Sequence, residues 1–267
     1  MDKHTFNELV NKKYITEVGK VDYYKNNDDA LEALKMEDLT DIVTNSVVSG
    51  FVGLPDFAQG GEFKLEKDIN LLYPIVIEKD TVIDLNGHNI INNTSFIDES
   101  DNSSNCYAFW VKSGKLTIKG KGEIEATANS EYDMAIWANG GDVEIYGGSY
   151  SNRGDSCDLI YASVGGNVTI FGGEFMAGGP ASGKAEGTKN PYCALNVKDA
   201  DYKAGKSNIV VKGGKFYNFD PANNVSETAE TNFLAPGYIS VEVAANVFVV
   251  EDTSDIVVDE GEIEIEE

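Results

Sequence analysis

The chain has 267 residues, and its 45 acidic and 21 basic side chains give a formal net charge of −24 at pH 7. Because phosphate backbones and anionic lipid headgroups repel such a surface, the composition argues against nucleic acid and membranes as partners. The length allows a sizeable hydrophobic core, and no apolar run reaches the length of a transmembrane helix.

The N-terminal stretch, residues 1–60, differs in pattern from the rest of the chain. It begins with a polar arm, and Asp28 and Asp29 are placed to cap a short helix over residues 30–35. A second helix is expected to end at Val47. No signal peptide is visible, so we expect synthesis in a reducing cytoplasm. We interpret this stretch as a mainly helical segment that covers one end of the following domain or anchors the protein to a partner.

A short stretch of alternating apolar residues that ends in glycine occurs five times between residues 61 and 220. The copies are Ile83–Gly87, Leu116–Gly120, Val143–Gly148, Val168–Gly173 and Ile209–Gly214. Their first glycines are 33, 27, 25 and 41 residues apart. A short unit repeated with insertions of variable length is typical of solenoid proteins.

Each copy belongs to a unit of three short strands. In the first four units an apolar strand lies eight residues before the second apolar residue of the copy, as Trp137 lies before Ile145. In the last unit this spacing stretches from Val197 to Val211 and makes room for a polar loop, Asp199–Ser207. A third strand, which includes Tyr150 in its unit, follows the glycines. Alternation directs Val143 and Ile145 inward and Glu144 outward. Because three such strands cannot bury a core alone, we expect the units to stack in parallel at about 4.8 Å per unit.

This pattern predicts an all-β fold, a right-handed parallel β-helix over residues 61–220, in which equivalent side chains lie above one another. A β-sandwich with evenly spaced strands is the competing interpretation. We favour the β-helix because the spacing within the unit recurs in successive copies.

Two pairs of aromatic residues occupy equivalent places in successive units. Trp110 and Trp137 are 27 residues apart and are expected to stack, either inside the fold or as an outward ladder that binds sugar or another subunit. Tyr146 and Phe171 each precede the glycines, and alternation from the neighbouring isoleucines directs them outward. All four are therefore candidate residues of a subunit or ligand interface.

The C-terminal piece, residues 221–267, departs from the repeat. Alternating residues predict one hairpin formed by Tyr238–Val243 and Val247–Val250, and a second formed by Asp255–Val258 and Glu262–Glu266. Unpaired strand edges at the end of a stacked fold invite aggregation. We interpret this piece as a cap or a self-association segment with an acidic tail.

The run Thr81–Ile90, with its lead-in strand Gly61–Ile69, resembles the first-coil signature of the pectate-lyase-like β-helix superfamily. That superfamily includes polysaccharide lyases, glycosidases, adhesins, and bacteriophage tailspikes and fibres, so the resemblance indicates a fold and leaves the function open. Residues 216–224 and 232–238 resemble β-helix modules of gut bacteria and of the virion proteins of their phages. Parallel β-helices on phages commonly trimerise, so the resemblance also implies a homotrimer.

Enzymes of this superfamily need charged groups that the chain does not supply in the expected arrangement. Arg153 is the only arginine and lies in a loop, and the only Asp-Asp pair, at 28–29, lies outside the repeats. Two suitably separated carboxylates can hydrolyse a glycosidic bond, which makes Asp133, Asp155 and Asp158 on consecutive units the candidates. We interpret these three as solvated loop acids and expect no catalytic or cofactor site.

The cysteines give no sign of a metal site. Cys106, Cys157 and Cys193 are odd in number and lack the spacing of metal ligands. The last two stand at predicted strand starts, where we interpret them as small buried thiols.

These observations lead to one preferred function and two alternatives. We expect a non-enzymatic structural or adhesive protein of a bacteriophage virion: a head fibre, capsid decoration or tail-fibre subunit assembled in the host cytoplasm. Residues 1–60 would bind a capsid or other virion protein, three copies would associate, and the domain would bind host or mucosal glycans. The alternatives are a polysaccharide depolymerase and a bacterial surface adhesin.

Overall fold

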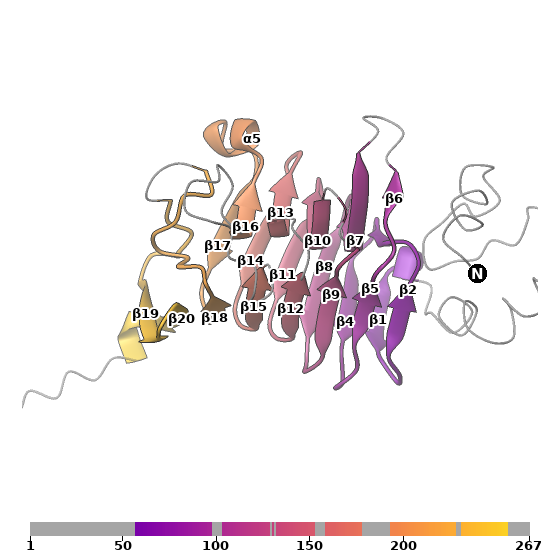
Figure 1. Ribbon diagram of the computed structural model, residues 1–267, viewed down its shortest axis with the longest axis horizontal. Coiled ribbons are helices and arrows are strands. Elements are labelled where there is room, and N and C mark those ends of the chain that lie inside the picture. The colour runs from indigo at the N-terminus through magenta and orange to yellow at the C-terminus, as the bar shows by residue number, and fades with distance from the viewer. Residues whose placement is uncertain are drawn as a thin grey trace, which may run out of the picture.

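A computed structural model of the chain provides the fold (Figure 1). The described residues are 57–97, 103–128, 130, 132–152, 158–177, 193–227 and 231–255. The expected N-terminal helices, the second C-terminal hairpin, Arg153, Asp155 and Cys157 lie outside these ranges.

The described part of the chain is mainly β and forms three sheets. Sheet 1 has the order β1 (Gly61–Lys64), β4 (Thr81–Asp84), β8 (Lys115–Lys119), β11 (Asp142–Ile145), β14 (Asn167–Ile170) and β17 (Asn208–Val211). Sheet 2 has the order β2 (Ile69–Leu71), β5 (Ile90–Asn92), β9 (Glu123–Ala126), β12 (Ser149–Asn152), β15 (Glu174–Ala177), β18 (Gly214–Tyr217), β20 (Val247–Asp252) and β19 (Tyr238–Ala244). Sheet 3 has the order β3 (Ile75–Ile77), β7 (Ser104–Val111), β10 (Tyr132–Asn139), β13 (Asp158–Ser163) and β16 (Cys193–Val197).

The chain visits the three sheets in a fixed order, and each passage through sheets 1, 2 and 3 is called a rung below. For example, β8, β9 and β10 form one rung, and each pairs in parallel with β11, β12 and β13 of the next. The rungs follow one another along the long axis of the molecule (Figure 1). The prediction of an all-β fold with parallel strands is therefore confirmed.

The register keeps equivalent side chains together from rung to rung. Ile145 pairs with Ile118 on one side and with Ile170 on the other, and all three are fully buried. Their neighbour Glu144 lies on the opposite face of the strand and is half-buried. Period-2 alternation thus places the apolar column of sheet 1 in the core.

Glycine is required where consecutive rungs approach most closely. A Cβ on Gly147 would lie 2.7 Å from the carbonyl oxygen of Gly120, and one on Gly213 would lie 2.3 Å from that of Phe171. The following glycine turns the chain, since Gly148 has a φ of +89°, which L side chains rarely adopt. The repeated Gly-Gly pair is therefore both a turn and a close backbone contact.

Aromatic rings also stack inside the core, on the strands of sheet 2. Tyr150 and Phe175 stack at 5.0 Å between centroids, and Phe175 and Phe216 at 4.8 Å. All three are fully buried. The Tyr150 hydroxyl donates to the Gly147 carbonyl oxygen at 2.9 Å, and burial raises the pKa of this phenol well above its ordinary value.

The C-terminal piece covers the last rung on all three sheets. On sheet 2, β18 pairs in antiparallel fashion with β20, and β19 and β20 form the first of the two expected hairpins. On sheet 1, the Val211 N–H donates to the Phe233 carbonyl oxygen at 2.8 Å. On sheet 3, side chains replace a strand, since the Val197 N–H donates to Glu227 Oε1 at 2.6 Å. These contacts satisfy backbone groups that would otherwise form an open edge.

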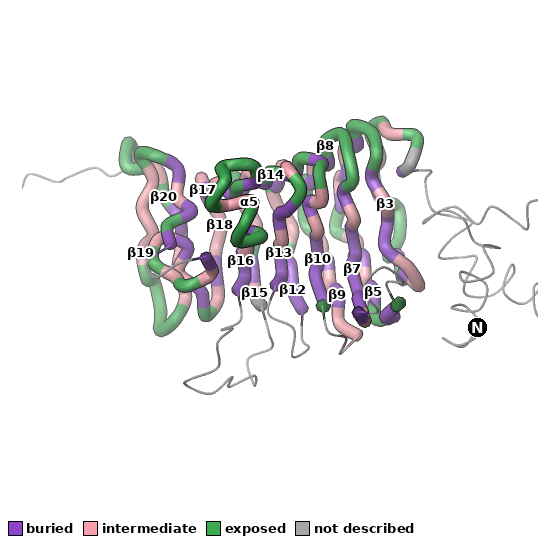
Figure 2. Tube along the Cα trace, turned by 90° about the horizontal axis from the view of Figure 1, so that it is seen from above, coloured by how far each residue is buried: buried purple, intermediate pink, exposed green. Residues whose placement is uncertain are grey.

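The predicted loop Asp199–Ser207 contains a short helix, α5 (Asp199–Lys203). The Asp201 carboxylate accepts a hydrogen bond from the Val164 N–H at 2.7 Å, which ties α5 to the preceding rung. Figure 2 shows α5 as a mostly exposed projection near the C-terminal end of the row of strands.

Candidate functional site

The outer face of sheet 3 carries a column of aromatic rings. Trp110 on β7 pairs with Trp137 on β10, which pairs with Tyr161 on β13. The two indoles stack at a centroid distance of 5.2 Å with 5° between their planes, and Tyr161 follows at 6.5 Å, tilted by 39°. All three side chains are half-buried. The two tryptophans thus form a stack that lies outside the main core.

Tyr107 and Met134 pack on the same outer face of the sheet, but they are only 3% and 4% exposed in a small cluster with Phe96. Strict alternation is interrupted in β7 and β10: Ala108 and Phe109 are consecutive and both fully buried, so Tyr107 and Trp110 both lie on the outer face. Counting by twos from Trp110 places Tyr107 inside, which is why the sequence pattern missed it. We call Tyr107, Trp110, Met134, Trp137 and Tyr161 the aromatic strip.

The edge of the aromatic strip is partly covered by the short strand β6 (Phe96–Ile97), which runs antiparallel to β7. Phe96 packs edge-on against Tyr107 at 5.4 Å between centroids. Tyr132 on β10 shares the face of Met134 and is 39% exposed, whereas Ile97 alternates with Phe96 and points to the other face of β6. The strip therefore continues into the exposed side chain of Tyr132.

Opposite charges stand at the two ends of the strip. The Lys112 Nζ lies 4.0 Å from the centre of the Trp110 ring, a cation–π contact. At the other end, burial raises the pKa of the Tyr161 phenol, and the negative charges of Asp158, Glu227 and Asp201 raise it further. The strip has a cationic end at Trp110 and an anionic end at Tyr161.

Glu227 is a buried carboxylate at this anionic end. Its Oε1 accepts the Val197 N–H, and its Oε2 has no hydrogen-bond partner among the described residues. Burial raises the pKa of Glu227 to about 7, against the opposing effect of the Val197 N–H, and the charges of Asp199 and Asp158 add to the rise. The Glu227 side chain therefore changes between its protonated and its charged form near neutral pH.

The interpretation of Asp133 and Asp158 as solvated loop acids is wrong. Asp133 is fully buried and accepts hydrogen bonds from the N–H groups of Ala128 and Ser130, at 3.1 and 3.2 Å, and from the Ser130 hydroxyl. Asp158 is 6% exposed and accepts the Asn196 amide at 2.7 Å. Asp133 satisfies local donors at the start of β10, and Asp158 accepts from the neighbouring strand β16. Hydrophobic periodicity does not reveal either role.

A second surface is the corner groove, an open groove of about 720 Å³ where sheets 1 and 2 meet. Its lining is Gly120, Lys121, Gly122, Tyr146, Gly147, Gly148, Ser149, Gly172, Gly173, Glu174, Gly214, Lys215 and Val249. The glycines of four successive rungs leave its floor without side chains. The groove therefore runs across rungs, along the axis on which the rungs follow one another.

The two walls of the corner groove differ in character. On the sheet 1 side, Tyr146 lines the groove and is 50% exposed. Phe171, 37% exposed and outside the lining, stacks on Tyr146 at 4.5 Å between centroids and 4° between planes. On the sheet 2 side stand Ser149, Glu174 and Lys215. One wall thus offers aromatic surface and the other offers donors and acceptors.

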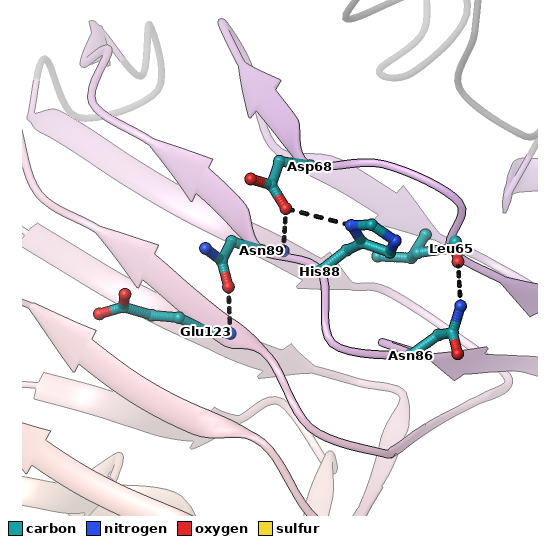
Figure 3. A network of polar contacts seen from close by, with 6 residues as sticks. All are labelled: Leu65, Asp68, Asn86, His88, Asn89 and Glu123. Carbon is teal, nitrogen blue, oxygen red and sulfur yellow. Dashed lines mark hydrogen bonds and ion pairs between the residues drawn. The ribbon is translucent and has the colours of Figure 1, made fainter.

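His88 belongs to a polar network that joins rungs (Figure 3). Its Nδ1 lies 3.3 Å from Asp68 Oδ1, which also accepts the Asn89 N–H at 2.9 Å. The Asn89 side chain in turn accepts the Glu123 N–H of the next rung at 2.9 Å. These contacts join backbone and side chains of successive turns, so they explain the network without a ligand.

The four predicted interface residues therefore fall on two surfaces, with Trp110 and Trp137 on the strip and Tyr146 and Phe171 at the groove. Among the described residues, no group of three or more His, Cys, Asp or Glu side chains is arranged to hold a metal ion. Cys193 is buried, as predicted. No described helix combines the length and apolar character that crossing a membrane requires.

Comparisons of the chain with protein-family models, curated proteins and solved structures found no significant match.

Proposed function

We propose that the protein is a non-enzymatic adhesive protein whose residues 61–220 form a right-handed parallel β-helix and whose corner groove binds a glycan chain. The β-helix is supported by the parallel pairing of every rung with the next in all three sheets. A sandwich would instead require two facing antiparallel sheets.

The shape and lining of the corner groove support a glycan as the ligand. Its volume of about 720 Å³ lies within the range of about 300–1,000 Å³ that is common for ligand sites. A sugar ring has an apolar C–H face and a rim of hydroxyls. The exposed ring of Tyr146, which Phe171 supports by stacking, suits the C–H face, and the polar wall with Ser149, Glu174 and Lys215 suits the hydroxyls.

The observation that carries this proposal is the exposure of Tyr146. Phe171 covers one face of its ring, yet half of the side chain remains accessible beside the groove. A stacked aromatic pair exposed at the edge of a groove marks a binding surface, because solvation of so much apolar area is unfavourable.

Glycan-array binding of the Tyr146→Ala variant tests the proposal. We expect the wild-type protein to bind a defined set of glycans, and the variant to bind them at least about tenfold more weakly, equivalent to about 1.4 kcal/mol. Val225→Ala is the control, since Val225 is 58% exposed and lies outside both the groove lining and the aromatic strip. Unchanged binding by Tyr146→Ala, or no binding by the wild type to any glycan, would contradict the proposal.

The virion setting belongs to the same proposal and rests on the sequence resemblance described above. In this setting, residues 1–60 attach the protein to a capsid or tail component, and the groove faces host or mucosal glycans. Mass spectrometry of purified phage particles tests it, because a structural subunit copurifies with particles in fixed proportion. Absence from particles whose host cells contain the protein would remove the virion role and leave the glycan proposal standing.

A polysaccharide depolymerase is the second candidate, and one observation favours it. The Glu227 pKa of about 7 lies near the value that suits a general acid at neutral pH. Release of reducing ends from a polysaccharide panel, abolished in Glu227→Gln, would establish this activity. The hydrogen bond from the Val197 N–H gives Glu227 a structural role instead, so we expect no release.

A further inference from the structure

We propose that the aromatic strip is the contact between two copies of this chain. The inference is independent of the glycan proposal, because the strip lies on sheet 3 and the corner groove lies between sheets 1 and 2.

The strip differs from the outer faces of the other two sheets in its lack of charge. The outward column of sheet 3 is Val76, Trp110, Trp137, Tyr161 and Asn196. The corresponding column of sheet 1 includes Glu144, and that of sheet 2 includes Glu125. Interface centres are depleted in charged residues and enriched in Trp and Tyr, and the partly exposed residues of the strip are Trp110, Trp137 and Tyr161.

Because the chain has a large net charge, self-association is favoured only at a surface with few charged side chains. Two copies that each carry a charge of −24 repel one another, so contact is favourable only across a face that brings few carboxylates together. The strip is such a face, and Tyr132, 39% exposed, extends it.

The charges at the two ends of the strip favour a second copy over an unrelated partner. When two strips face each other with their axes antiparallel, Lys112 of each copy approaches the anionic end of the other, where Asp201 is partly exposed and Asp158 is buried beneath. Both ends of the contact then pair opposite charges. An arrangement in which the same patch meets itself is the two-fold symmetric interface that most homodimers use.

Sedimentation and native mass measurements on the full chain test the proposal. We expect the wild type to have the mass of a dimer at micromolar concentration, because a two-fold contact closes at two copies. The homotrimer that the resemblance implies would need a different contact and would overturn the proposal. Trp137→Ala is expected to raise the dissociation constant at least tenfold, because it removes the central ring of the contact. Tyr146→Ala alters an aromatic outside the strip and is expected to leave the mass unchanged.

Two charge-reversal variants test the proposal even if Trp137→Ala fails to fold. Lys112 and Lys121 are both exposed lysines, one at the strip and one at the corner groove. Lys112→Glu is expected to weaken association at least tenfold, whereas Lys121→Glu, which changes the net charge equally, is expected to weaken it less. A monomeric wild type overturns the proposal, as does an oligomer that Lys112→Glu and Lys121→Glu affect equally.

Discussion

At the scale of single residues, the spacing between rungs is fixed by positions that tolerate no side chain. Gly213 is the clearest case, because a Cβ there would lie 2.3 Å from the carbonyl oxygen of Phe171 and 3.0 Å from its carbonyl carbon. Neither atom can move without displacing the backbone of the preceding rung. This constraint differs from the demand for a positive φ, which Gly213 does not have.

Two substitutions separate the effect of a close backbone contact from the effect of a positive φ. Gly213→Ala is expected to cost about 3 kcal/mol of unfolding free energy, since it forces two backbones apart in a packed core. Gly205→Ala is expected to cost about 1 kcal/mol, because Gly205 has a φ of +64° and strain is then the main effect. Urea unfolding of both variants gives the comparison. Equal costs would mean that the rungs yield to the extra methyl group.

At the scale of elements, the sequence predicted strands and their faces better than the contacts between them. The apolar positions Val143 and Ile145 were correctly placed inside, because period 2 and a buried face are both properties of the local pattern. Tyr107 and Met134 were missed, since two consecutive inward residues in β7 and β10 reverse the alternation. Such a reversal depends on how the strand bends around the core, which short-range periodicity does not encode.

The sequence pattern also did not reveal the side chains that cover β16, the last strand of sheet 3. Glu227 covers the edge of β16 by accepting the Val197 N–H, and the Ser226 hydroxyl donates to the Leu195 carbonyl oxygen at 2.8 Å. Residues 224–227 look like ordinary polar loop in the sequence. Their function as a substitute for a strand appears only once β16 is known to be the last strand of sheet 3.

Closure of β16 by a carboxylate makes the stability of this end pH-dependent. The folded-state pKa of Glu227, about 7, exceeds its ordinary value of 4.5, so the folded chain holds this proton more tightly than the unfolded chain does. The contribution of Glu227 to stability is therefore full below about pH 4.5 and is lost as the pH rises through about 7.

The Glu227→Gln variant isolates this contribution, because glutamine keeps a carbonyl acceptor for the Val197 N–H and does not titrate. We expect the unfolding free energy of the wild type to fall relative to that of the variant between pH 4.5 and pH 7. Urea titrations at several pH values measure the difference. A constant difference across this range would show that Glu227 has an ordinary pKa in the folded protein.

At the scale of the whole molecule, an elongated stack of rungs distributes its charge over a large surface. Ion pairs such as that of Lys115 with Glu144, at 3.1 Å, join partly exposed side chains, and such surface pairs contribute little stability. These ion pairs therefore offset little of the electrostatic repulsion that the net charge of −24 produces. Repulsion among carboxylates should oppose both folding and the approach of a second copy.

Salt should consequently stabilise the protein at neutral pH. Raising the ionic strength from about 0.01 M to about 0.15 M shortens the Debye length from about 30 Å to about 8 Å, which weakens repulsion between distant carboxylates. For each 1 kcal/mol gained, we expect the melting temperature to rise by about 2–4 °C, measured by calorimetry. The same salt step near pH 4.3, the isoelectric point of the sequence, is the control and should have little effect. A melting temperature that falls with salt at pH 7 would mean that attraction between opposite charges outweighs the repulsion.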